Sequence, residues 1–359
     1  MKSWRFAFVA LIMFGGCRGV DSELVYEPDG SEVIRFSADS LLNYTLNGRV
    51  FTSSDSLGSP LLIATSERRI YVGDNKATQP LLVFNRNTGE FIMSVGERGQ
   101  GPREINYLWA MDFKPGSESG WLFEFSDRTM HFFDGDSLTG HSIRLQNTGP
   151  PMGPTWIRGD SIASVGMYED GRLALHGPDG SFGRFIGAHP PGESEVPIPV
   201  RQHAYEARVQ TNANGSRIAV VSQNTDLIEI YDTEGILHVI RGPGFDEPVY
   251  TLHSDDEGDN TWLSLDDETI KSYVDVTVTN DLIFALYSGQ TMEDIMNSSW
   301  VSPPSETVIV FSWSGIPLAV LNIDHGALAI SVSSDGLDLY AIYHRPAPMI
   351  LHYELPEIS

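Results

Sequence analysis

Short apolar runs separated by turn residues recur along most of the chain. The clearest case is residues 81–102, where the runs 81–84 (LLVF) and 91–95 (FIMSV) flank a polar turn that contains Gly89. Runs this short and rich in β-forming residues predict strands. Asn and Gly in the turn tolerate the positive φ of a hairpin. Residues 96–102 hold three glycines and a proline and predict a shaped loop after the hairpin.

The same arrangement recurs toward the C-terminus. Turn glycines follow further apolar strands at Gly140, Gly180, Gly235 and Gly315, and a sixth copy, residues 350–353, has no return strand. Most of these steps have the length of a propeller blade, about 40 to 50 residues. Another predicted strand precedes each copy, at residues 70–74, 121–125, 161–165, 217–221, 282–287 and 339–343.

Six units of one strand order predict an all-β fold, a six-bladed β-propeller of four-stranded antiparallel blades. A ring is favoured because closure removes exposed sheet edges. The sixth unit lacks its last strand, so we expect an N-terminal strand, with residues 32–36 as the candidate, to complete it and close the ring. A pair of β-sandwiches is the alternative, but it does not explain six repeats. We assign residues 31–359 to the propeller.

The first 30 residues predict export. Lys2 and Arg5 precede the apolar run 6–14, which has signal-peptide length and is too short to span a bilayer. Small residues then lead to Cys17, the only cysteine, in an arrangement that resembles the bacterial lipoprotein signal. We therefore expect a signal peptide at residues 1–16, lipidation of Cys17 and a tether at residues 17–30. Ordinary secretion is the alternative.

The residue after this cysteine is Arg18. By resemblance to lipoprotein sorting, it implies anchoring in the bacterial cell envelope at the outer membrane rather than the inner membrane. The formal net charge of −25 argues against nucleic-acid partners and against adsorption to anionic lipid. We expect a monomer that meets the membrane through its lipid anchor only.

Residues 251–272 and 289–305 interrupt the repeat. The first insertion contains Asp255, Asp256 and Asp259, whose oxygens could bind Ca²⁺. Their spacing does not match a twelve-residue calcium loop, and a solvated acidic run is the alternative. No other cofactor is expected. Residues 187–200 are proline-rich and predict an ordered crossing between blades, or a lid over one face.

The glycine-rich run 96–105 (GERGQGPREI) resembles an element of bacterial six-bladed TolB-like and NHL-like propeller lipoproteins. It departs from that element at Arg103 and Ile105. Residues 276–289 and 308–353 resemble the TolB-like group as well. The resemblance implies the propeller fold and an extracytoplasmic lipoprotein, and it implies no particular reaction.

In propellers of this kind, the loop after the second strand of each blade rims the central channel. Polar groups that converge on such a mouth are the default hypothesis for a ligand site. Alternatively, these polar groups cap strands and hold water in the channel. The predicted channel-mouth residues are Asp74, Asn75, Arg103, Glu104, Asp127, Arg128, Gln223, Tyr287, His344 and Arg345.

Catalytic signatures are missing from the sequence. The ten histidines form no HxH or HxxxH pair, and there is no G-x-S-x-G elbow, so we assign neither catalytic nor metal-binding residues. The favoured function is a lipid-anchored binding or scaffold module for an envelope protein, peptide or glycan, without catalysis. The alternative is a propeller lyase or hydrolase with a metal or an acid pair in the central channel.

Overall fold

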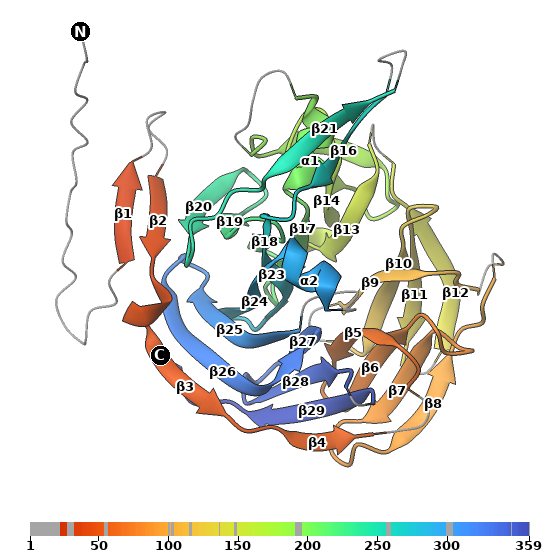
Figure 1. Ribbon diagram of the computed structural model, residues 1–359. Helices are drawn as coiled ribbons and strands as arrows, with labels where there is room; N and C mark the ends of the chain where they lie inside the picture. The colour runs from red at the N-terminus through yellow and green to blue at the C-terminus, as the bar shows by residue number, and fades with distance from the viewer. Residues whose placement is uncertain are drawn as a thin grey trace, which may run out of the picture.

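Six antiparallel sheets follow one another around a ring, which Figure 1 shows from one face. The computed structural model describes residues 22–26, 32–53, 57–99, 101, 104–114, 117–135, 137–146, 149–190, 196–255, 260–298, 304–345 and 347–358. Each sheet is one blade, with its first strand on the inside and its last strand on the outside. The prediction of a six-bladed β-propeller is therefore confirmed.

The first three blades use consecutive strands. Blade 1 contains β5 (Pro60–Thr65), β6 (Arg69–Asp74), β7 (Leu81–Asn85) and β8 (Phe91–Val95). Blade 2 contains β9 (Leu108–Phe113), β10 (Ser119–Glu124), β11 (Thr129–Asp134) and β12 (Ser137–Arg144). Blade 3 contains β13 (Pro151–Trp156), β14 (Ile162–Gly166), β15 (Leu173–His176) and β16 (Phe182–Ile186), with a short 3-10 turn (Arg158–Asp160) between β13 and β14.

The last three blades take additional strands from the N-terminus. Blade 4 contains β17 (Ala207–Thr211), β18 (Ile218–Ser222), β19 (Leu227–Tyr231) and β20 (Ile236–Arg241). Blade 5 contains β23 (Ile270–Val278), β24 (Leu282–Thr291), β25 (Ser305–Ser312) and β26 (Pro317–Ala327). Blade 6 contains β27 (Ala329–Val332), β28 (Asp338–Tyr343) and β29 (Met349–Glu354), and its fourth strand comes from the N-terminal region.

The N-terminal strands form a belt around the outside of blades 4 to 6 (Figure 1). It comprises β1 (Ser22–Tyr26), β2 (Glu32–Phe36), β3 (Leu42–Leu46) and β4 (Arg49–Thr52), with a 3-10 turn (Ala38–Ser40) before β3. Strand β2 pairs in parallel with β20, β3 pairs in parallel with β26, and β4 pairs antiparallel with β29.

The N-terminal strand that closes the ring is therefore β4, and the prediction that residues 32–36 close it was wrong. Those residues form β2, which lies on blade 4. The reason is position along the belt, because the chain must pass blades 4 and 5 before it reaches blade 6. Ser22–Tyr26, which falls in the expected tether, forms β1 and pairs with β2.

The core consists of one apolar layer between each pair of neighbouring blades. The middle strands β18 and β19 are buried along their whole length, because each of their faces packs on an adjacent blade. The layer between blades 4 and 5, for example, contains Ile228, Tyr273 and Phe311. Apolar residues in the middle strands therefore need not alternate with polar ones.

The repeated turn glycines have two structural reasons. Gly89, Gly180 and Gly315 adopt positive φ between the third and fourth strands of their blades, whereas Gly140 adopts it within β12. Gly89 and Gly180 also lie against the outer strand of the preceding blade. A Cβ at Gly180 would come within 2.5 Å of the Arg144 carbonyl oxygen. The turn glycine thus sets both the hairpin and the spacing of blades.

Polar side chains connect the closing strand β4 to blade 6 and, through it, to blade 1. Arg49 Nε donates to His352 Nδ1 at 2.9 Å, so Nε2 carries the histidine hydrogen and donates to Asp338 Oδ1 at 2.6 Å. Arg86 of blade 1 donates to Asp338 Oδ2 at 2.9 Å. We call these four residues the closure network. It joins the belt, blade 6 and blade 1.

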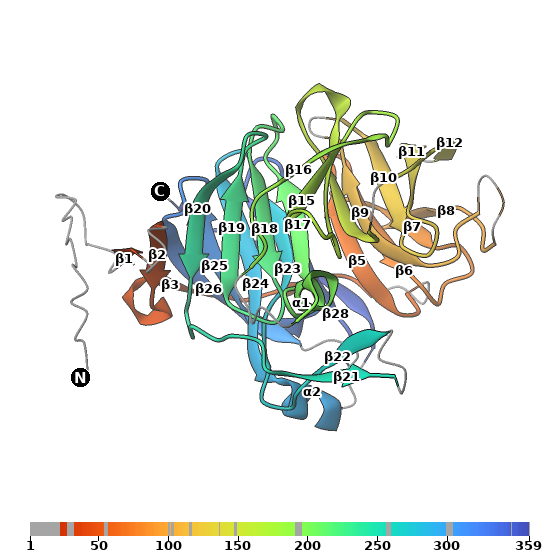
Figure 2. The same ribbon diagram turned by 90° about the horizontal axis from the view of Figure 1, so that it is seen from above.

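The insertions lie on one face of the ring, which we call the insertion face (Figure 2). They include α1 (Ile198–Ala204), the hairpin β21 (Tyr250–Ser254) and β22 (Thr261–Leu265), and α2 (Met292–Asn297). The hairpin residue Leu263 packs in a small apolar cluster with Ala204 and Tyr205 at the end of α1. No helix within the described residues has the length and hydrophobicity needed to cross a membrane.

Candidate functional site

The innermost strands of all six blades line a central channel. Its narrow part is a cavity of about 70 Å³, bounded by residues of β5, β9, β13, β17, β23 and β27. The polar side chains in this lining are Asp112, Arg208, Gln210, Asp275, Thr277 and Ser331. A space this small holds water or a small ion rather than an organic substrate.

Strand alternation places the charges in the channel. In β17, Ala207 and Val209 belong to the apolar layer between blades 3 and 4, so Arg208 and Gln210 point the other way, into the channel. The Arg208 guanidinium crosses from blade 4 to blade 2, where Nη1 donates to the Trp109 carbonyl at 3.4 Å. Asp275 Oδ2 accepts from the Ile330 N–H of the next blade at 2.8 Å.

Burial shifts the proton affinity of both channel carboxyls. It raises the pKa of Asp112 to about 7, against the lowering effect of hydrogen bonds from the Phe113 N–H and Gln210. Burial also raises the pKa of Asp275 to about 6, although the positive charge of Arg208 lowers it. The two carboxyls repel each other when both are ionised. Together they can hold a proton near neutral pH, as a general acid or base must.

The channel mouth on the insertion face carries a second group of charges. Lys271 Nζ donates to Asn224 Oδ1 at 2.5 Å. Burial lowers the pKa of Lys271, the nearby Glu206 raises it, and Arg208 lowers it. Gln223 links strands through its backbone here, since its N–H donates to Glu206 and its carbonyl accepts from Ser272.

The predicted residues Asp74 and Asn75 organise loops of blade 1. The buried Asp74 carboxylate accepts from the backbone N–H groups of Gly58, Ser59, Lys76 and Ala77. The Asn75 amide bonds both backbone groups of Leu108. Glu104 accepts from the Gly101 N–H at 2.8 Å, and its carboxylate occupies the space beside Gly99. Arg103 lies outside the described residues.

The other predicted residues are distributed around the ring. Asp127 is exposed in the β10–β11 turn, where Arg128 has positive φ. Tyr287 packs edge-on against Tyr273 with ring centroids 5.4 Å apart. His344 Nε2 lies 2.7 Å from the Pro60 carbonyl and joins blade 6 to blade 1, and Arg345 follows it in the same loop. Most of these residues thus organise loops or join strands and blades, and their convergence on one ligand site at the channel mouth stays a prediction.

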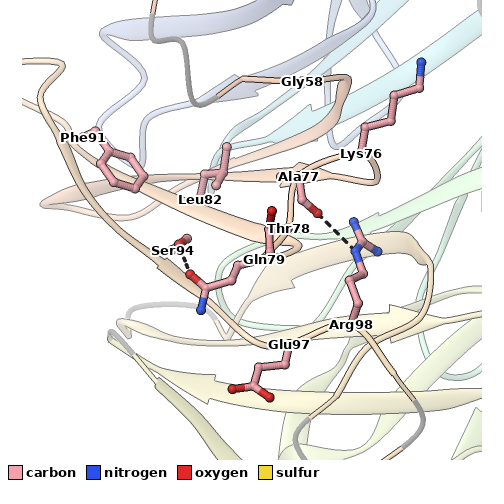
Figure 3. A pocket seen from close by; sticks show the side chains of 10 residues that line it. All are labelled: Gly58, Lys76, Ala77, Thr78, Gln79, Leu82, Phe91, Ser94, Glu97 and Arg98. Atoms are coloured by element: carbon pink, nitrogen blue, oxygen red, sulfur yellow. Dashed lines mark hydrogen bonds between the residues drawn. The ribbon is translucent and has the colours of Figure 1, made fainter.

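A larger pocket lies on blade 1, between the β6–β7 loop and the outer strand β8 (Figure 3). We call this cavity of about 840 Å³ the outer pocket. Its volume is in the range of ligand sites. The lining residues are Gly58, Lys76, Ala77, Thr78, Gln79, Leu82, Phe91, Ser94, Glu97 and Arg98.

The outer pocket has an apolar wall and a polar rim. Leu82 and Phe91 lie on the face of blade 1 that packs against blade 6. Phe91 is 43 % exposed. Arg98 holds the loops in place by donating to the carbonyls of Asp74, Ala77 and Asn106. Gln79 bonds the Ser94 hydroxyl across the pocket (Figure 3).

Sequence reasoning missed the channel charges and the outer pocket. The channel charges could have been found from β17, where Arg208 and Gln210 alternate with apolar residues ahead of a continuous apolar strand. The outer pocket had no such signal, since its residues come from three segments of blade 1. Both sites depend on how strands are placed around the ring.

The expected calcium site is only partly described. Asp255 Oδ2 accepts from the Asn260 side-chain amide at 2.6 Å, and Asp256 and Asp259 lie outside the described residues. Within the described part of the chain, no three His, Cys, Asp or Glu side chains form a group that could hold a metal ion. Cys17 also lies outside the described residues.

A family model described as "TolB-like 6-blade propeller-like" matches residues 42–335. The chain belongs to the TolB-like six-bladed propeller family. This match begins at β3 of the belt, spans blades 1 to 5 and ends in blade 6 after β27. The predicted resemblance of the chain to the TolB-like group is confirmed. A comparison with curated protein sequences finds no match.

Two solved structures with the same fold come from Bacteroides. One, a member of the DUF4221 family from Bacteroides vulgatus, has a TM-score of 0.59 and 9 % identity, covering 89 % of this chain and 98 % of that one. Another, a predicted exported protein from Bacteroides fragilis, has a TM-score of 0.56 and 11 % identity, covering 88 % and 99 %. At such identities these two structures establish the fold alone.

Proposed function

We propose that this TolB-like propeller is a lipid-anchored protein of the bacterial cell envelope that binds a protein, peptide or glycan partner without catalysis. Cys17 and the apolar run before it support the anchor. The structural likeness to a predicted exported protein supports an extracytoplasmic location. Outer-membrane anchoring, rather than the inner membrane or free secretion, follows from Arg18 by lipoprotein sorting.

One observation carries the binding role. The cavity in the central channel, which Arg208 crosses, has a volume of about 70 Å³. The outer pocket on blade 1 has a volume of about 840 Å³. An organic ligand or a side chain of a partner fits the second space and not the first. Binding at the rim of the ring leaves the channel as part of the framework.

The anchor is tested by Cys17→Ala in the full-length precursor, expressed in a Gram-negative host. We expect the wild type to fractionate with outer membranes and to enter the detergent phase of Triton X-114. The variant should move to the soluble periplasmic fraction, since a single lipid-modified cysteine supplies the anchor. Cys17→Ala that stays with the membrane would show that the lipid anchor is not what holds the protein.

The binding role is tested by chemical crosslinking in intact envelopes followed by affinity purification. We expect one envelope component to crosslink at a fixed stoichiometry with folded wild-type protein, and not with heat-denatured protein. A wild-type protein that crosslinks to nothing above the denatured control would overturn the proposal.

The second candidate is a lyase or hydrolase that uses the channel acid pair, alone or with a metal. The raised pKa values of Asp112 and Asp275 favour it, because perturbed carboxyls in a cavity are candidates for acid–base catalysis. Native mass spectrometry with metal analysis on protein lacking Cys17 separates the candidates. A stoichiometric metal that Asp112→Asn and Asp275→Asn remove would favour the enzyme, whereas a metal-free mass favours the binding role.

A further inference from the structure

The outer edges of the blades are used differently around the ring. Blades 4 and 5 accept extended segments of the same chain in parallel, with Ile34 opposite Ile240 and Leu321 opposite Tyr44. Among the described strands, none pairs with the outer edges of β8, β12 or β16. The outer edge of β4 in blade 6 is also unpaired among the described strands. The fold therefore accepts a fifth strand on a blade, and four blades leave that place open.

Only β8 combines an open edge with the outer pocket. Phe91 and Ser94 belong to β8 and line the pocket. Their cross-strand partners are Phe84 and Leu82, so these side chains share the face of blade 1 that packs toward blade 6. A strand added to β8 would extend this face and place alternate side chains beside Phe91.

The charges around β8 favour one kind of strand. Glu90 and Glu97 are exposed and stand directly before and shortly after β8. The basic residues nearby are less available, because Arg98 donates to three backbone carbonyls and the Lys76 amine points away from the other lining residues (Figure 3). The net charge of −25 also favours a positively charged strand.

We propose that the outer edge of β8 binds an extended peptide segment of a partner protein by strand addition, with an apolar side chain in the outer pocket and basic residues flanking it toward Glu90 and Glu97. Main-chain hydrogen bonds to β8 would supply affinity, and the pocket would supply specificity. The inference rests on the proposed binding function and names its site and its ligand class.

The probe is a fluorescein-labelled peptide, KKTVLVTKK, titrated with full-length mature protein in fluorescence anisotropy at low salt. Two comparison peptides carry EE in place of KK at both ends, or N-methyl groups on alternate core amides. We expect each change to weaken binding at least tenfold, since one reverses the charge and the other removes main-chain donors.

Matched protein variants locate the site. Phe91→Ala should weaken binding at least fivefold. Ile236→Ala is the control, because Ile236 has the same place in the outer strand of blade 4, is similarly exposed at 46 %, and belongs to a strand whose edge is occupied by β2 from Val239 to Arg241. Glu97→Lys should also weaken binding, whereas Glu268→Lys makes the same charge change on an exposed loop before β23 and should not.

Equal binding of the N-methylated peptide would overturn strand addition, and equal effects of Phe91→Ala and Ile236→Ala would overturn the location. No binding of KKTVLVTKK at 1 mM would overturn the inference as a whole. Failure here is distinguishable from failure of the proposed function. If Phe91→Ala still crosslinks its envelope partner as well as the wild type does, only the β8 site is wrong.

Discussion

At the scale of single residues, the structure distinguishes buried charges that serve the framework from those that remain titratable. Arg172 belongs to the first kind. Its guanidinium donates to Glu229 at 2.8 Å, to the Tyr205 carbonyl and to Ser222, and Tyr231 donates to the other Glu229 oxygen. A buried ion pair is tolerated when its hydrogen bonds are complete. This pair joins blade 3 to blade 4.

Asp112 belongs to the second kind, because its raised pKa couples channel protonation to stability. The folded protein binds this proton more tightly than the unfolded chain, whose Asp pKa is near 3.8. The stabilisation is therefore complete below about pH 4 and is lost as the pH rises toward 7. Besides burial, the groups that act on this pKa are the Phe113 N–H, Gln210 and Asp275, and Arg208 acts on Asp275.

We predict that Asp112→Asn, which is neutral at every pH, unfolds with a free energy about 1–2 kcal/mol higher than the wild type at pH 8. This free energy is well below the one that corresponds to the full pKa shift, because the Asp112 side chain is only partly buried and solvent screens its charge. The two proteins should converge near pH 4. Denaturant titrations from pH 4 to pH 9 measure this.

The control for this prediction is Asp179→Asn. Asp179 is an exposed turn residue whose pKa is lowered by hydrogen bonds from Ser181, so its replacement should give no gain at pH 8. An Asp112→Asn protein that is less stable than the wild type at pH 8 would contradict the prediction. It would mean that the ionised carboxylate stabilises the channel through Arg208.

At the scale of elements, the belt explains why the closing strand was misidentified. Residues 32–36 and 49–52 both form strands, and β4 is the shorter of the two. Local sequence preference does not indicate which blade a strand joins. Pairing with β29 is instead supported by the closure network, in which His352 bonds both Arg49 and Asp338.

We predict that Asp338→Ala destabilises the protein by about 2–3 kcal/mol. The reason is that the Asp338 carboxylate accepts hydrogen bonds from both Arg86 and His352, and both are lost. Arg86 would lose its 2.9 Å bond and keep the longer contacts of 3.6 Å to Asp335 and 3.4 Å to the Glu67 carbonyl. Thermal melts at pH 7 provide the measurement. The matched control is Asp335→Ala, which leaves the Arg86–Asp338 pair intact and should cost less. Equal losses would show that Asp338 has no special place in closure.

At the scale of the whole molecule, ring closure depends on residues from both ends of the sequence. The layer between blades 6 and 1 contains Phe51 of β4 beside Phe84, Tyr340 and Ile350. The Phe51 carbonyl lies where a Cβ on Gly89 would be. Loss of β4 would therefore expose the β29 edge and part of this layer.

We predict that a mature protein beginning at residue 54 melts roughly 5–10 °C lower than one beginning at residue 32 and forms oligomers through the open β29 edge. Size-exclusion chromatography with thermal melts compares the two. A protein beginning at residue 37 serves as control, since it lacks β2 but keeps β3 and β4. If all three proteins melt alike and remain monomeric, β4 does not close the ring.

The sequence by itself determined the number of blades, their middle strands and their turn glycines. These follow from local preferences, namely apolar β-forming runs and glycines such as Gly89 that need positive φ. Only the tertiary structure decided that β4 closes the ring, that Arg208 crosses the channel beside Asp112 and Asp275, and that Phe91 borders a pocket. The reason is that each of these features joins blades or loops far apart in the chain, and no local pattern records which side chains will meet.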